Sequence, residues 1–159
     1  MKTILHGLLG MLVLSVGAAA QSTGGGRLVG SWDAVVTPRV CATGDAITTF
    51  NSVYNFNEGG TFTGRSSGTG SGGNGRDQLG VWNLVEGNHY RARFTAYLFN
   101  AAGQVTGYQV LTNNIELNQD ASGWSATGIS QTFNFDDVQT AAGCSTTVGT
   151  RVTLDETRK

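Results

Sequence analysis

The clearest secondary-structure signal in the chain is the stretch 78-QLGVWNLVEGNHYRARFTAYLFN-100. In residues 78–85 and 89–99, aromatic and branched side chains alternate with polar or small ones, as in strands that bury one face. Between them, Glu86-Gly87-Asn88 supplies residues that tolerate positive φ, which a tight hairpin requires. The stretch therefore predicts two antiparallel strands joined by a short turn.

Similar β-type segments and turns recur on both sides of this hairpin. We expect eight strands and no helix, at residues 29–40, 46–57, 61–65, 78–85, 89–99, 104–117, 123–135 and 144–154. Most connections between them are a few Gly- and Asn-rich residues, so sequential neighbours are expected to pair antiparallel. The prediction is an all-β fold with an up-and-down meander.

The one long connection predicted is the glycine-rich loop 66-SSGTGSGGNGR-76. A phosphate-binding loop would need a Lys-Ser or Lys-Thr pair and a following helix, and the chain has neither at this place. We therefore interpret the segment as a flexible hairpin tip or lid.

Composition and charge limit the function classes. The chain has 159 residues, 24 of them Gly, and only 13% are charged, which is typical of one domain and excludes a helical bundle or coiled coil. A hydrophobic content of 39% and a net charge of −1 argue against disorder. Ten scattered Lys and Arg residues are too few for a basic nucleic-acid-binding face, so we expect no nucleic-acid partner.

Residues 1–20 have the pattern of a secretory signal peptide. Lys2 is followed by an apolar run over residues 4–16 and by the small residues Ala18-Ala19-Ala20 at the expected cleavage site. The apolar run is too short for a membrane anchor, which needs roughly 20 residues. We expect a single mature domain, residues 21–159, that is secreted or periplasmic and has no integral membrane segment after cleavage.

The mature chain contains two cysteines, Cys41 and Cys144. In an oxidising compartment an even pair predicts one disulfide. A metal site is the alternative, but His89 is the one histidine left after cleavage. Pairing Cys41 with Cys144, or Trp32 with Arg151, places the first strand beside the last in nearly one register, offset by two residues. A diagonal contact or a bulge at Pro38 would absorb that offset, and the sheet would close into a barrel.

The motif Gly30-Ser31-Trp32, with Arg151 near the end of the last strand, resembles the G-x-W signature of the lipocalin and calycin superfamily and its late arginine. The chain thus resembles a small secreted bacterial lipocalin-like barrel. Two departures are expected: residues 155–159 leave no room for the helix that follows the lipocalin barrel, and the first long loop is reduced to residues 42–45. The resemblance implies that Trp32 and Arg151 are structural, the guanidinium stacking on the indole.

Alternation along the expected strands places eight aromatic residues inside as candidate ligand-binding residues. They are Phe50, Tyr54, Phe56, Trp82, Tyr90, Phe94, Tyr108 and Trp124. The seventh strand needs a bulge if both Trp124 and Phe133 are to face inward. These rings either line an open cavity or fill a solid core. The small inward residues Ala92, Ala96, Gly107, Ala126 and Gly128 keep the cavity interpretation open.

No catalytic or metal-binding pattern is recognisable, and no cofactor is expected. His89 lies at a turn, and Asp136-Asp137 have the pattern of solvated turn acids. The interpretation we favour is a barrel that binds or sequesters a small hydrophobic molecule, with its oligomeric state open. The alternatives are a cavity-based isomerase or cyclase like the plant allene oxide cyclase barrels, or an envelope barrel that binds another protein by its rim.

Overall fold

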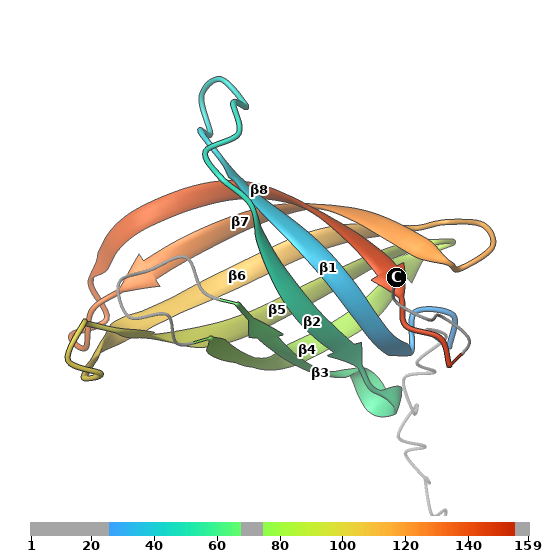
Figure 1. Cartoon of the computed structure of the whole chain (residues 1–159), viewed down its shortest axis with the longest axis horizontal. Helices are drawn as coiled ribbons and strands as arrows, with labels where there is room; N and C mark the ends of the chain where they lie inside the picture. The colour runs from blue at the N-terminus through green and yellow to red at the C-terminus, as the bar shows by residue number, and fades with distance from the viewer. Residues whose placement is uncertain (1–25, 68–74, 155–159) are drawn as a thin grey trace, which may run out of the picture.

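Eight antiparallel strands follow one another in the computed structural model, which describes residues 26–67 and 75–154 (Figure 1). They are β1 (Gly30–Arg39), β2 (Phe50–Phe56), β3 (Thr61–Ser66), β4 (Arg76–Glu86), β5 (His89–Phe99), β6 (Val105–Leu117), β7 (Gly123–Phe133) and β8 (Gln139–Arg151). A single turn of 3-10 helix, η1 (Glu58–Gly60), joins β2 to β3. The predicted signal peptide lies outside the described residues, as does most of the glycine-rich loop.

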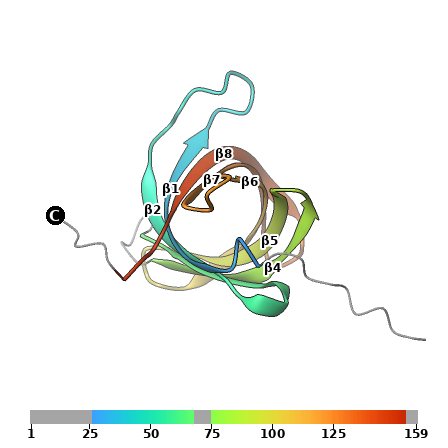
Figure 2. The same ribbon diagram turned by 90° about the vertical axis from the view of Figure 1, so that its right-hand side faces the viewer.

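Each strand pairs with its sequence neighbours, and β1 also pairs with β8, so the sheet closes (Figure 2). The predicted all-β, eight-stranded, up-and-down barrel is thus confirmed. Short turns between strands leave no room for a crossover, and this is why the order in the barrel equals the order in the chain. No helix within 26–67 or 75–154 is long and apolar enough to cross a membrane.

The contact between the first and last strands has the predicted register. Trp32 is the partner of Arg151, and Arg39 is the partner of Cys144. Cys41 lies two residues beyond Arg39 and forms the predicted disulfide with Cys144 diagonally, with a Cα–Cα distance of 5.2 Å. Pro38 is in register opposite Ser145, so the diagonal contact, and not a bulge, absorbs the offset.

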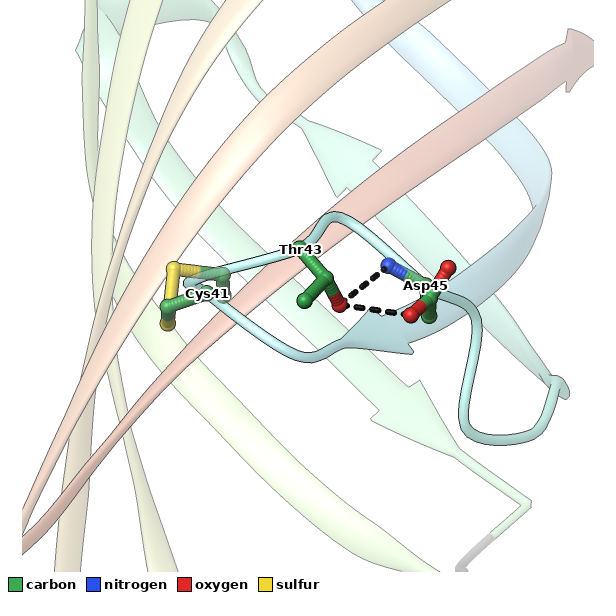
Figure 3. The surroundings of a disulfide bond; sticks show 4 residues. Cys41, Thr43 and Asp45 are labelled. Carbon is green, nitrogen blue, oxygen red and sulfur yellow. Dashed lines mark hydrogen bonds between the residues drawn. A yellow bond between two sulfur atoms is a disulfide. The ribbon is translucent and has the colours of Figure 1, made fainter.

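The β1–β2 connection is longer than predicted and projects from the barrel wall (Figures 1 and 2). The ladder of β1 with β2 ends at Val36 and Phe50, and beyond it an isolated bridge pairs Arg39 with Ala46, so residues 46–49 do not continue the strand. Pro38 has no N–H to donate, and its carbonyl accepts instead from the Ile47 amide at 2.9 Å. The disulfide holds the base of this connection, where Thr43 and Asp45 form a local hydrogen-bonded turn (Figure 3).

The β7–β8 turn lies earlier than predicted and is shorter. Asn134 accepts hydrogen bonds from the amides of Asp136 and Val138, both at 3.0 Å, and this tight turn starts β8 at Gln139. Phe133 is the partner of Tyr108 with no register shift on the β6 side and stays on the outer face. The register shift on the β8 side, between Thr132 and Phe133, does not turn it inward. The strand β8 ends at Arg151 and does not extend to residue 154.

Large apolar side chains fill one end of the barrel, where the chain enters and where the β2–β3, β4–β5 and β6–β7 turns lie. The fully buried side chains there are Leu28, Trp32, Phe56, Phe62, Tyr90, Phe94, Leu117 and Trp124. Their rings contact one another edge-to-face or stacked, which adds to the stabilisation from burial. This end of the barrel is a solid core, and we call it the closed end.

Candidate functional site

The closed end is capped by Arg151 and Trp32. The Arg151 guanidinium carbon lies 4.1 Å from the centroid of the Trp32 ring. This is the stacking that the resemblance to the lipocalin motif implied. The Trp32 indole N–H donates to the Leu28 carbonyl at 3.0 Å. A Cβ at Gly30 would come within 2.6 Å of Arg151 Nη1, so glycine leaves the space in which the arginine lies. The G-x-W segment therefore closes this end to a ligand.

Six of the eight aromatic candidates belong to the packed core. Tyr54, Phe56, Trp82, Tyr90, Phe94 and Trp124 all face inward and are at most 5% exposed. Each lies within ring-contact distance of at least one other, for example Tyr54 stacked on Trp124 with centroids 6.1 Å apart. These rings form the floor beneath the remaining interior and leave little of their own surface for a ligand.

The other two candidates differ from these six and from each other. Phe50 faces inward, packs on the core and is half-buried. The predicted inward orientation of Tyr108 is wrong. Asn113, Ile115 and Leu117 face inward on β6, and with no register shift between them and Tyr108, alternation places Tyr108 on the outer face.

Above the aromatic floor, five of the buried inward-facing side chains are polar. They are Ser52, Ser66, Gln78, Asn113 and Thr147, each at most 5% exposed. Among the described residues, Gln78 Oε1 in this layer and Trp124 Nε1 in the floor have no hydrogen-bond partner, while the Ser52 hydroxyl lies close to the Tyr54 phenol. This polar layer was not predicted from the sequence, although Ser52 lies on the same strand face as Tyr54, and Gln78 on the same strand face as Trp82. The buried layer therefore combines an aromatic floor with unsatisfied hydrogen-bonding groups.

The opposite end of the barrel is open to solvent. Inward positions there are half-buried, including Leu98, Gln109, Leu111, Ser130 and Ser145. Leu111 packs on the core from above and keeps part of its surface exposed, so water reaches the top of the core. We call this half of the interior the open end.

Three of the small residues expected to face inward do so. Ala92, Ala96 and Gly128 are buried at inward positions. A Cβ at Gly128 would lie 2.4 Å from Asn113 Oδ1 and 2.6 Å from Ser145 Oγ. Glycine thus allows polar groups of β6 and β8 to approach each other across β7.

Tyr54 contributes the most perturbed titratable group in this interior. Burial raises the pKa of Tyr54 to about 12, and the nearby Ser52 hydroxyl opposes that shift. The phenol is therefore protonated over the whole physiological range and can donate a hydrogen bond.

The residues considered for catalysis from the sequence lie outside the barrel interior. His89 begins β5 on the outer face, opposite Glu86 and Glu116. Asp137 lies in the exposed β7–β8 turn and accepts a hydrogen bond from the Tyr108 hydroxyl at 2.6 Å. Within the described ranges, no three His, Cys, Asp or Glu side chains are grouped so that they could hold a metal ion.

Comparison with known proteins identifies no family for this chain. No protein-family model matches the chain, and no curated protein matches it. A solved structure of a redesigned β-barrel is similar with a TM-score of 0.48 and 13% sequence identity, covering 80% of this chain and 94% of that one. The barrel assignment rests on the strand pairing itself.

Proposed function

We propose that this protein is a lipocalin-like, secreted or periplasmic barrel that binds one small molecule in its open end. The ligand has an apolar part and a hydrogen-bonding part. The apolar part rests on Phe50 and Leu111, which form the upper surface of the core. The hydrogen-bonding part faces the polar layer around Ser52 and Gln78.

One observation carries the proposal: the buried Gln78 Oε1 of the polar layer lacks a hydrogen-bond partner among the described residues. A buried polar group without a partner costs about 1–3 kcal/mol, so such groups are kept where something else satisfies them. Bound ligand would supply that partner after a small shift of the side chains that cover Gln78, whose Oε1 has almost no exposed surface. The polar layer is also the reason to change the expected ligand from a purely hydrophobic molecule to an amphiphilic one.

The test is native mass spectrometry of the mature, oxidised protein purified from its own exported fraction. We expect a mass excess that disappears on denaturation. The fluorescence of anilinonaphthalene sulfonate, an apolar probe with one anionic group, then tests the site in ligand-free protein. The variant Ser130→Leu fills the open end from β7 and should abolish saturable probe binding.

The matched control is Thr127→Leu, which adds the same side chain to an exposed outward position of the same strand. It should bind the probe as the wild type does. Equal probe binding by both variants, together with a bare polypeptide mass, would show that the interior is not a binding site.

A further inference from the structure

A row of outward-facing side chains crosses five consecutive strands near the open end. Arg65 on β3 is the partner of Asp77 on β4, and Tyr97 on β5 is the partner of Tyr108 on β6, which in turn is the partner of Phe133 on β7. Asp77 precedes Gln78, and Gln78 pairs with Ala96, so Asp77 lies opposite Tyr97. The three rings therefore occupy neighbouring positions, and we call them the aromatic row.

The aromatic row is held in place, with Tyr97 exposed and with Tyr108 and Phe133 half-buried and stacked on each other. Tyr97 is 59% exposed, although an aromatic ring of this size normally gains from burial. The rings of Tyr108 and Phe133 are nearly parallel, with an interplanar angle of 16° and centroids 5.2 Å apart. The hydrogen bond from Tyr108 to Asp137 fixes the middle ring. Little side-chain entropy would thus be lost on binding a flat partner.

A groove of about 290 Å³ continues the row on the β3–β4 side. It is lined by Tyr97, Phe99 and the ion pair between Arg65 and Asp77, whose Nη1–Oδ1 distance is 2.8 Å. Both members of the ion pair are largely exposed, with 64% and 73% of their side-chain surface accessible. The groove therefore offers a ring face, a donor and an acceptor at one end of the aromatic row.

This combination points to one class of ligand. We propose that the aromatic row and its groove bind a neutral polysaccharide chain. A sugar ring has an apolar face of C–H groups that can stack on an aromatic ring and hydroxyls at its edge that can bond to the guanidinium and carboxylates. The row spans roughly 10 Å because neighbouring strands lie about 4.8 Å apart, a distance similar to the length of a disaccharide unit.

Charge argues against a polyanion such as a nucleic acid. Asp77 at one end of the row and Asp136-Asp137 at the other outnumber Arg65, which is itself paired with Asp77. A polyphosphate would need a cluster of unopposed basic groups along its path. A neutral, hydroxyl-rich chain requires no such cluster.

The experiment is affinity electrophoresis of the mature protein in native gels that contain hydroxyethyl cellulose, xyloglucan or galactomannan, with sedimentation on insoluble cellulose and chitin. We expect retention by at least one of these neutral polysaccharides. Tyr97→Ala and Phe133→Ala should each weaken it about five- to tenfold, the effect of losing one stacked ring. Val148→Ala is the control, because Val148 is also 59% exposed but lies on β8, away from the row.

Several results would overturn the proposal. Wild-type protein that none of these polysaccharides retains would do so, as would retention that Tyr97→Ala and Phe133→Ala leave unchanged. Sedimentation velocity adds a third test: a self-association that Tyr97→Ala abolishes would show that the aromatic row is an interface between copies of this chain. Stronger retention by an anionic polysaccharide than by the neutral ones would show that the charge argument is wrong. Circular dichroism confirms that each variant is folded.

Discussion

Arg151 stacks on Trp32 with its guanidinium carbon 4.1 Å from the ring centroid, and the same side chain ties three chain segments together. Its Nε donates to the Ala121 carbonyl at 2.7 Å and Nη1 donates to the Val29 carbonyl at 2.8 Å, while Nη2 donates to the Arg27 carbonyl. The last strand, the β6–β7 turn and the segment before β1 thus meet at one group. Partial burial lowers the pKa of Arg151 from its usual value.

Arg151→Ala should lower the free energy of unfolding by about 2–4 kcal/mol, because it removes a partly desolvated cation–π contact and leaves carbonyl groups without their donor. Urea denaturation followed by tryptophan fluorescence measures this loss. Arg151→Lys keeps the charge but not the planar fork, so it should recover less than half of the loss. Ligand binding at the open end should be unchanged in both variants, and equal stability of wild type and Arg151→Ala would contradict the structural role.

The disulfide should be the largest single contribution to stability. Cys41 and Cys144 are 103 residues apart, and closing a loop of that length restricts the unfolded chain by about 4–5 kcal/mol in the chain-entropy model. The double variant Cys41→Ser with Cys144→Ser should therefore unfold at a much lower urea concentration than the oxidised wild type. Reduced wild type is the control and should match the double variant; a double variant as stable as oxidised protein would refute the expectation.

The fold could be predicted because its information is local. Alternating side chains define each strand, and short turns define which strands pair. The long-range relations needed were the pairings of Trp32 with Arg151 and of Cys41 with Cys144. The β1–β2 connection was predicted less well. Residues 46–49 have a β-type sequence, but Pro38 across from them lacks the N–H that would extend the ladder, so an isolated bridge between Arg39 and Ala46 replaces a continuous strand.

The interior was harder to predict because the rule of apolar inside and polar outside fails at the open end. On β6, the inward positions include Gln109 and Asn113, while Tyr108 lies outside. Hydrophobicity alone therefore selects the wrong face for this half of the strand. Leu117 is fully buried at the closed end. Assigning every second residue from Leu117 to the inner face gives the correct orientation along the rest of β6.

Gly149→Ala should be strongly destabilising, because a Cβ at this position would lie 2.1 Å from Cε2 of Trp124. The indole is buried among the core rings and cannot move away without displacing them. We expect a loss of about 3 kcal/mol, at the upper end of typical overpacking penalties. Gly143→Ala on the same strand is the control. Its Cβ would meet only the Ser130 hydroxyl, at 2.9 Å, which a rotation of that half-buried side chain relieves. Similar thermal midpoints for the two variants would show that Trp124 does not require glycine beneath it.

The pH dependence of stability should show the burial of Tyr54. Its pKa is raised from 10.0 to about 12 in the folded protein, chiefly because burial disfavours the phenolate. The unfolded chain therefore releases this proton at lower pH than the folded one does. The stabilisation is fully present below pH 10, decreases as the pH rises above 10 and is lost once it passes about 12. A shift of this size corresponds to about 3 kcal/mol.

Tyr54→Phe removes the titrating group and keeps the ring, so the free energy of unfolding of this variant should decline less steeply between pH 10 and 12 than that of the wild type. Urea denaturation at a series of pH values measures both slopes. Tyr97→Phe is the matched control, since Tyr97 is 59% exposed and its loss should leave the wild-type slope intact. If the free energies of unfolding of wild type and Tyr54→Phe decline with pH in parallel, the Tyr54 phenol is hydrated in solution. The floor of the open end would then be hydrated as well.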